Sequence, residues 1–309
     1  MTILFSSDSE PPEPWRQAFA RAMPGMPFRV WPDSGPLEDI RYALIWRPDP
    51  EALLRLPNLK AILVLGAGVD VALSNPGLPA SIPVVRLLDA GMADPMAEYA
   101  LHAVLHFQRR MREYAVHQQD ANWRPLPWKL AQEWPVGVMG LGIMGGLIAR
   151  RIAALGYPVA GWVRSPRAVE GIEVFAGMNK LRQFLARTRV VINALPLTPE
   201  TQDILGAKAF AAMPAGAFVV NIGRGAHLVD EDLIDALDSG HLEGAMLDVF
   251  RQEPLPASHA FWRHPKIVIT PHVAAPTIIA AAEIQVIENI RRLERGEPPL
   301  GVVDRKKGY

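Results

Sequence analysis

The chain has 309 residues, and at about 150 residues per domain this length predicts two domains. Its 32 basic and 32 acidic residues cancel, so it lacks the excess positive charge that binds nucleic acid or an anionic membrane surface. The absence of cysteine excludes disulfide bonds, thiolate metal ligands and a cysteine nucleophile.

The start of the chain and its apolar segments favour a cytoplasmic location. The first residues, Met-Thr-Ile-Leu-Phe-Ser-Ser-Asp, lack the basic start and the cleavage site of a signal peptide. The longest apolar runs have the length of β-strands and are too short to cross a membrane as helices. We therefore expect a cytoplasmic protein that has no membrane partner and no nucleic-acid partner.

The first hundred residues alternate short β-rich runs with more polar segments. The runs cover residues 2–5, 28–31, 43–46, 61–65 and 84–87. Such short apolar runs are typical of the buried strands of a parallel sheet. This part of the chain therefore predicts a small α/β domain of the flavodoxin-like kind.

A long helix is predicted from Asp94 to Arg112. Aspartate is a favoured N-cap and proline a favoured first-turn residue, and Pro95 follows Asp94 directly. His102 and His106 share one face of this helix at a spacing that can bind a metal ion. No third ligand accompanies them and their neighbours are apolar. We therefore expect a packed or solvated pair and no metal site.

Six β-rich runs then alternate with amphipathic segments. The runs cover residues 136–139, 159–163, 190–194, 217–222, 245–249 and 267–270. The segments between them predict crossover helices, and the six runs predict a doubly wound parallel sheet of the Rossmann kind. A last helix at residues 278–295 follows the sixth run, and it can return the chain to the first domain.

The fold class that follows is α/β, with two doubly wound parallel-sheet domains. A Rossmann cofactor domain at residues 99–277 would be inserted in a flavodoxin-like substrate domain, which would combine residues 1–98 with residues 278–309.

A glycine motif marks the first strand of the second sheet. Gly140, Gly142 and Gly145 form a GxGxxG pattern between the run at 136–139 and an amphipathic segment. In this setting the first glycine permits a tight turn, the second admits a pyrophosphate, and the third allows close packing of helix and strand. A bare GxGxxG is weak evidence, but its position between strand and helix predicts dinucleotide binding.

The acid that commonly binds the ribose diol of NAD is missing after the second strand of this sheet. Arg164, Ser165 and Arg167 stand there instead. Guanidinium groups bind phosphate through paired N–H donors. The substitution favours NADPH over NADH, and the alternative is a solvated basic turn.

Three further strand ends of this sheet carry polar residues. Arg224 follows the fourth run, Glu253 follows the fifth, and His272 follows the sixth. The carboxyl ends of parallel strands lie at one edge of the sheet, where cofactors bind. Each residue alone is unremarkable, but their common setting predicts a site.

At this point the sequence resembles the D-2-hydroxyacid dehydrogenase family, and within it the glyoxylate/hydroxypyruvate reductase A type. The resemblance covers nearly the whole chain. The motifs that carry it are Trp46-Arg-Pro, Leu65-Gly-Ala-Gly68-Val-Asp70, Arg86-Leu-Leu-Asp-Ala-Gly-Met92, Trp123-Arg-Pro-Leu-Pro127, Gly244-Ala-Met-Leu-Asp-Val-Phe250 and Val303-Asp-Arg-Lys-Lys-Gly-Tyr309. The phosphate motif reads Gly-Leu-Gly-Ile-Met-Gly, a spelling shared with β-hydroxyacid dehydrogenases, but those begin with the motif and carry a catalytic lysine segment that this chain lacks.

The resemblance implies a catalytic trio of Arg224, Glu253 and His272. Arg224 would bind the substrate carboxylate and carbonyl, His272 would donate a proton, and Glu253 would hold the imidazole ring. Substrate contacts are also implied for Trp46, Gly66, Ala67, Gly68 and Val69, although Trp46 can equally be a core aromatic. The implied cofactor contacts are Gly140, Leu141, Gly142, Ile143, Met144, Arg164, Ser165, Arg167, Leu195, Pro196, Ile222, Gly223, Arg224, Asp248 and His272.

The implied activity is the NADPH-dependent reduction of small 2-keto acids, such as glyoxylate or hydroxypyruvate, to glycolate or D-glycerate. The resemblance also implies a homodimer, in which the arm around Trp123 can reach the partner. Another enzyme of the superfamily, a phosphoglycerate or formate dehydrogenase, is an alternative, although the loop from Gly66 to Asp70 carries no Lys or Arg for a phosphate. A third possibility is a dinucleotide-sensing binding protein, because fold alone does not establish turnover.

Overall fold

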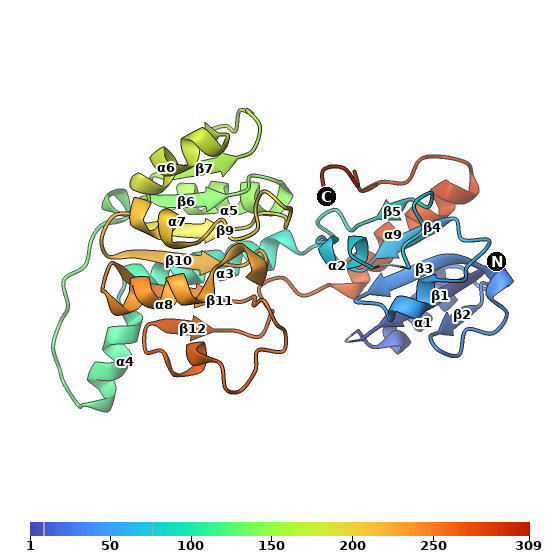
Figure 1. Ribbon diagram of the computed structural model, residues 1–309, viewed down its shortest axis with the longest axis horizontal. Helices are drawn as coiled ribbons and strands as arrows, with labels where there is room; N and C mark the ends of the chain where they lie inside the picture. Colours follow the sequence, from blue (N-terminus) through green and yellow to red (C-terminus); the bar gives the residue numbers. More distant parts are fainter. Residues whose placement is uncertain (9, 76) are drawn as a thin grey trace. The chain divides into compact units, whose positions relative to one another are not determined.

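The computed structural model describes residues 1–8, 10–75 and 77–309. These residues form two compact units, one of Met1–Met92 with Thr277–Tyr309 and one of Ala93–Pro276 (Figure 1). Each unit is built on one parallel β-sheet, which confirms the predicted fold class. The predicted boundary after residue 98 falls inside a helix that begins at Ala93 and belongs to the second unit. The assignment of substrate and cofactor roles to the two units stays a prediction.

The described part of the first unit contains a five-stranded sheet in the order β2-β1-β3-β4-β5. This is the strand order of flavodoxin-like folds. Ile3, Leu4 and Phe5 are inaccessible to solvent or nearly so, as expected for strands covered on both faces. The strands are β1 (Thr2–Ser7), β2 (Phe28–Val30), β3 (Ile40–Trp46), β4 (Ala61–Val64) and β5 (Val84–Val85).

Helix α9 (Ile279–Glu294) belongs to this first unit although it comes near the end of the chain. It packs against α1 (Pro12–Ala22), whose Trp15 and Phe19 are buried. The residues after α9 continue along β5, where Val303 N donates a hydrogen bond to Val84 O at 2.8 Å. The shorter helices of the unit are α2 (Asp70–Leu73), η1 (Leu37–Asp39) and η2 (Pro50–Leu53).

The second unit contains, within the described residues, a seven-stranded parallel sheet in the order β12-β11-β10-β9-β6-β7-β8. The order reverses between β6 and β9, which is the topological switch point where ligands bind in Rossmann folds. The strands are β6 (Val136–Met139), β7 (Val159–Val163), β8 (Glu173–Ala176), β9 (Val190–Asn193), β10 (Ala217–Asn221), β11 (Leu242–Leu247) and β12 (Ile267–Ile269).

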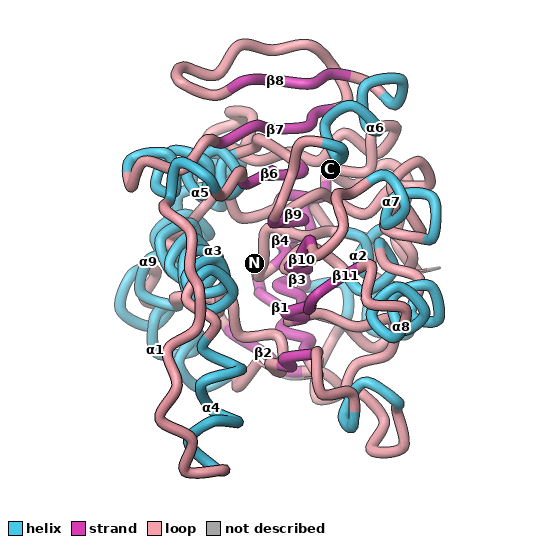
Figure 2. The backbone as a smooth tube through the Cα atoms, turned by 90° about the vertical axis from the view of Figure 1, so that its left-hand side faces the viewer, coloured by secondary structure: helices cyan, strands magenta, loops and turns pink. Residues whose placement is uncertain are grey.

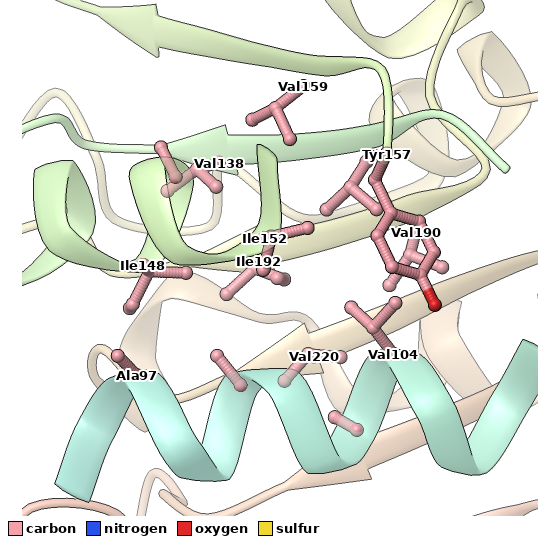
Figure 3. Close-up of a cluster of buried hydrophobic side chains, with 14 of the residues drawn as sticks. Ala97, Val104, Val138, Ile148, Ile152, Tyr157, Val159, Val190, Ile192 and Val220 are labelled. Atoms are coloured by element: carbon pink, nitrogen blue, oxygen red, sulfur yellow. The ribbon is translucent and has the colours of Figure 1, made fainter. Parts of the chain in front are cut away.

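Helices cover both faces of this sheet (Figure 2). On one face α3 and α5 pack together, and Ala97, Val104, Ile148 and Ile152 meet strand residues such as Val138 (Figure 3). On the other face lie α6, α7 and α8. The helices are α3 (Ala93–Gln108), α4 (Met111–Gln119), α5 (Ile143–Ala154), α6 (Met178–Ala186), α7 (Ala207–Ala212), α8 (Asp230–Asp238), η3 (Ala131–Glu133), η4 (Gly225–His227) and η5 (Ala260–Arg263).

The prediction of one long helix from Asp94 to Arg112 is wrong in its extent. Arg110 has a left-handed backbone (φ +56°), which ends the first helix and separates α3 from α4. The predicted N-cap, Asp94, lies within the first turn of α3, where its carboxylate accepts a hydrogen bond from Arg151. Strand β8 was not among the six predicted strands, because only Val174 and Phe175 give it a short apolar centre.

Candidate active site

The glycine motif lies between β6 and α5, at the switch point of the sheet. Gly140 has φ +91°, and a Cβ on Gly145 would stand 1.8 Å from Gly140 O, so neither position admits a side chain. A Cβ on Gly142 would meet no atom within 4 Å. The backbone at the N-terminus of α5 is therefore open to a ligand, and helix N-termini favour anions. These residues fit the pyrophosphate of a dinucleotide.

The strand β7 ends at Val163, and the residues after it are exposed. Arg164, Ser165 and Arg167 lie in this turn, as the sequence predicts. The pKa of Glu200 is lowered by hydrogen bonding to Thr198 and also by the charge of Arg164. Glu200 therefore lies within electrostatic range of Arg164, in the segment that follows β9.

His272 and Glu253 form a direct contact. His272 Nδ1 lies 2.8 Å from Glu253 Oε2, and the other carboxylate oxygen, Oε1, accepts a hydrogen bond from Phe250 N at 3.0 Å. The Glu253 side chain is 15% exposed and the His272 side chain is 33% exposed. Both oxygens of this largely buried carboxylate are thus engaged, and the imidazole is held through one nitrogen while its ring stays accessible.

The carboxylate of Asp248 organises the loop that carries His272. It accepts hydrogen bonds from Thr270 Oγ1 at 2.6 Å, Val273 N at 2.8 Å and Ala274 N at 2.9 Å. The backbone of His272 also donates to Asp248 O at 2.9 Å. These bonds hold His272 at φ +56°, a left-handed conformation that a residue other than glycine keeps only where its surroundings enforce it.

A tyrosine on α3 extends this arrangement. Tyr99 Oη lies 2.6 Å from Thr270 Oγ1. The single hydroxyl proton of Thr270 is donated to Asp248, so Tyr99 must be the donor in its contact with Thr270. Burial, together with the charge of Asp248, raises the pKa of Tyr99 to about 12. The phenol therefore keeps its proton throughout the neutral pH range.

Arg224 follows β10 on a short loop that leads into η4. Its Nη1 donates to Gly223 O at 2.8 Å. Ile222 and Gly223 are buried beneath it, and Leu195 and Pro196 follow the neighbouring strand β9. The loops after β9, β10, β11 and β12 thus come from adjacent strands of one sheet.

The glycine loop of the first unit follows β4. A Cβ on Gly66 would stand 2.3 Å from Trp46 Cζ3, so the indole ring of Trp46 packs directly on Gly66. Ala67 and Gly68 are partly exposed and Val69 is buried. Trp46 and this loop are therefore neighbours, as expected for the predicted substrate residues, and their roles stay a prediction.

Sequence reasoning brought Arg224, Glu253 and His272 to one sheet edge, and the structure places them after β10, β11 and β12. It missed Tyr99, Thr270 and His227, which support these residues through side-chain contacts. His227 has one usable signal, because it stands three positions after Arg224 and can accept from the backbone there.

The paired histidines of α3 lie with ring centroids 5.8 Å apart. Among the described residues, no group of three or more His, Cys, Asp or Glu side chains could hold a metal ion. In the same part of the chain, none of the helices has the length and apolar character to cross a membrane.

Residues 101–274 match the family model for the NAD binding domain of D-isomer specific 2-hydroxyacid dehydrogenases. The chain belongs to the D-2-hydroxyacid dehydrogenase family. Curated relatives match it over its whole length: the glyoxylate/hydroxypyruvate reductase A of Serratia proteamaculans is 44% identical, and that of Yersinia enterocolitica is 40% identical, each over 100% of both chains.

Solved structures of D-2-hydroxyacid dehydrogenases agree with this assignment. An enzyme of the family from Xanthobacter autotrophicus Py2, in complex with NADPH and MES, has a TM-score of 0.95 and 39% identity and covers 100% of this chain and 99% of its own. The NADPH-dependent glyoxylate/hydroxypyruvate reductase from Sinorhizobium meliloti, in complex with NADP and sulfate, has a TM-score of 0.94 and 37% identity at the same coverage. The predicted family and type are confirmed, and this D-2-hydroxyacid dehydrogenase is an oxidoreductase.

Proposed function

We propose that this D-2-hydroxyacid dehydrogenase reduces small 2-keto acids, such as glyoxylate and hydroxypyruvate, to glycolate and D-glycerate with NADPH. The observation that carries the proposal is the 2.8 Å contact of His272 Nδ1 with Glu253 Oε2. A histidine held by a carboxylate at the carboxyl edge of a Rossmann sheet is suited to move a proton at the cofactor. The names of the curated relatives support the choice of substrates.

Reduction of a ketone needs a proton at the carbonyl oxygen as hydride reaches the carbonyl carbon. When bound, NADPH supplies the hydride from its nicotinamide. His272 donates the proton from Nε2, because Nδ1 is committed to Glu253. Glu253 cannot rotate freely, since Phe250 N holds its second oxygen. The pair therefore delivers the proton in one fixed direction.

Arg224 binds the substrate. A guanidinium presents paired N–H donors that match a carboxylate, and it can also polarise the neighbouring carbonyl. The contact of Nη1 with Gly223 O at 2.8 Å orients the side chain. In the first unit, the loop from Gly66 to Val69 and Trp46 are proposed as further substrate residues, because backbone N–H groups of a glycine loop can bind an anion.

The cofactor is held by residues of the second unit. Gly140, Gly142 and the N-terminus of α5 take the pyrophosphate, as the open space at Gly142 allows. Arg164, Ser165 and Arg167 take the 2′-phosphate of NADPH, because their donors replace the acid that favours NAD. The structures of relatives that hold NADPH or NADP support this choice. Leu195, Pro196, Ile222, Gly223 and Asp248 are proposed as the remaining contacts.

We also infer that the enzyme is a homodimer. Residues from the last turn of α3 to the start of β6 carry large apolar side chains that are exposed in the single chain, and such patches mark interaction surfaces. Trp123 is 98% exposed, and the others are Leu105, Met111, Val116, Trp128 and Leu130. Light scattering is expected to give twice the chain mass of 34.0 kDa, and a monomer at micromolar concentration would contradict the inference.

The proposed reaction is tested with the purified protein and both cofactors. NADPH oxidation is followed with glyoxylate, hydroxypyruvate, pyruvate and phosphohydroxypyruvate. We expect turnover of the first two with NADPH. Turnover of phosphohydroxypyruvate alone would identify a phosphoglycerate dehydrogenase instead, and NADPH binding without turnover of any keto acid would indicate a dinucleotide-sensing protein.

The role of His272 is tested by His272→Asn with His241→Asn as the matched control. General acid catalysis contributes about 10²–10⁴-fold, so His272→Asn should lose activity on that scale and keep its NADPH affinity. His241 precedes β11, so it lies at the amino ends of the strands, away from the proposed site at their carboxyl ends. It contacts Phe210 O, and its substitution should leave activity unchanged. Activity of His272→Asn within threefold of wild type would overturn the assignment.

A further inference from the structure

A buried polar cluster lies beneath the loop that carries Arg224. It consists of Asn193 at the end of β9, Asn221 at the end of β10, and His227 at the end of η4. All three side chains have no exposed surface. Buried polar groups are costly unless each finds a partner, so the bonds within the cluster determine which proton each group carries.

The Nδ1 atom of His227 receives two donors. Arg224 N lies 3.1 Å from it, and Asn193 Nδ2 lies 2.8 Å from it. A backbone N–H and the NH2 group of a side-chain amide can only donate, so Nδ1 must carry a lone pair. The imidazole is therefore neutral, and its one proton resides on Nε2.

That proton also has a partner. His227 Nε2 lies 3.2 Å from Pro196 O, a carbonyl that can only accept. The ring thus bonds on one side to the loop after β10 and on the other side to the loop after β9. A carbon side chain of similar size would leave Arg224 N, Asn193 Nδ2 and Pro196 O without these partners.

The two asparagines complete the arrangement. Asn193 Nδ2 donates its second hydrogen to Asn221 Oδ1 at 2.9 Å, and Asn221 Nδ2 donates to Arg224 O at 3.0 Å. The backbone of Arg224 is therefore held at its N–H by His227 and at its carbonyl by Asn221. Gly223 packs against the same cluster, since a Cβ there would stand 3.0 Å from Asn193 Nδ2.

We propose that His227 is a positioning residue of the reductase, which sets the place of Arg224 through its unprotonated Nδ1. The proposal rests on the function given to Arg224 above. His227 does not touch the reacting atoms. Its ring fixes the backbone of Arg224 relative to Leu195 and Pro196, so one side chain sets the spacing between a substrate-binding residue and two proposed cofactor contacts. A shift of about 1 Å in such a residue can cost a hundredfold in rate.

Three variants separate this role from a general loss of packing. In His227→Asn the amide oxygen can occupy the place of Nδ1 and accept from Arg224 N. In His227→Gln the amide reaches the place of Nε2 and leaves Arg224 N unpaired. His227→Leu removes both functions. We expect kcat/KM for glyoxylate to fall less than about tenfold in His227→Asn and about a hundredfold in the other two, because only His227→Asn keeps the bond to Arg224.

Three measurements do not depend on turnover. Nitrogen NMR of the imidazole groups, with His227 assigned by its absence from the His227→Asn spectrum, should show the neutral form protonated at Nε2 in wild type. Thermal unfolding and NADPH titration report whether each variant folds and binds cofactor. If His227→Leu fails to fold, the proposal is still tested by the NMR result and by the comparison of His227→Asn with His227→Gln.

A charged ring, or a ring protonated at Nδ1, would overturn the proposal. So would equal losses in His227→Asn and His227→Gln at matched thermal stability, or full activity in His227→Leu. If wild type reduces no keto acid, the proposed function fails, whereas the NMR result still tests the hydrogen-bond assignment by itself.

Discussion

A Cβ built on Gly225 would stand 1.8 Å from the carbonyl carbon of Phe250 and 2.1 Å from its oxygen. Gly225 follows Arg224, and Phe250 N is the group that holds Glu253 Oε1. The loops that carry Arg224 and Glu253 therefore touch backbone to backbone, and this approach depends on the absence of a side chain at Gly225.

Gly225→Ala should separate these loops. The atoms in the way belong to the backbone and cannot rotate aside, so we expect a loss of about 1–3 kcal/mol in the free energy of unfolding, as for overpacking. The loss in kcat/KM should reach about a hundredfold. Gly146→Ala is the matched control, because the nearest atom to its Cβ, 3.4 Å away, is the end of the Arg150 side chain. Calorimetry measures the stability of the two variants and initial rates measure their kcat/KM. Equal losses in Gly225→Ala and Gly146→Ala would contradict the proposed effect of the contact between the loops.

The chain of bonds from Tyr99 through Thr270 to Asp248 predicts a graded series. Tyr99→Phe removes one donor, and a net hydrogen bond contributes about 0.5–1.5 kcal/mol to stability. Asp248→Asn replaces one carboxylate oxygen with NH2, so either Thr270 Oγ1 and Val273 N, which donate to Oδ1, or Ala274 N, which donates to Oδ2, loses its acceptor. It should therefore displace the His272 loop and reduce kcat far more than Tyr99→Phe does. Thermal unfolding and kcat with glyoxylate test the order, and a larger loss in Tyr99→Phe would refute it.

The exposed arginines after β7 predict the cofactor preference. Hydrogen bonds to charged groups contribute about 1.5–3 kcal/mol each, less when exposed, so NADPH should exceed NADH at least about tenfold in kcat/KM. Salt should reduce this ratio, because charges near the surface are screened. Arg164→Asp should lower the ratio by repelling the 2′-phosphate and by binding the ribose diol of NADH.

The control for Arg164→Asp is Arg263→Asp, which makes the same charge change in η5. This helix lies next to β12, the edge strand farthest from β7 in the sheet. It should leave the cofactor ratio unchanged. An unaltered ratio in Arg164→Asp would mean that the basic turn is only solvated.

His106 predicts a dependence of stability on pH. Burial lowers its pKa from 6.5, and the charge of His102 adds to this effect while Glu113 opposes it. The unfolded chain therefore binds a proton at a higher pH than the folded chain. Stability is greatest above about pH 6.5 and falls as the pH drops below that value, because only the unfolded state gains the proton. In His106→Phe the fall in melting temperature between about pH 7 and pH 5 should be smaller. An identical fall would exclude this histidine as its source.

The strands and the site loops were predictable for a physical reason. Buried parallel strands need continuous apolar runs, such as Val136–Met139, and their carboxyl ends meet at one edge, so polar residues that follow them converge. Arg224, Glu253 and His272 were found in this way without any knowledge of contacts.

Other features depend on contacts that no local pattern reveals. Tyr99 and Thr270 are 171 positions apart in the chain, so their hydrogen bond has no signature in spacing. Arg110 breaks the helix after Gln108 with a left-handed backbone although arginine is a good helix former. Strand β8 lies at the edge of its sheet with Glu173 exposed, so its sequence lacks the apolar run of a central strand.

The order of strands in the second sheet has a consequence for engineering. Two strands, β6 and β9, separate β7, which precedes Arg164, from β10, which precedes Arg224. Three spacings of about 4.8 Å place these strands about 14 Å apart. Substitutions at that distance without shared partners contribute additively to free energy. Cofactor preference can therefore be redesigned after β7 and substrate preference after β10 in separate libraries, and the gains in kcat/KM should multiply when the best variants are combined.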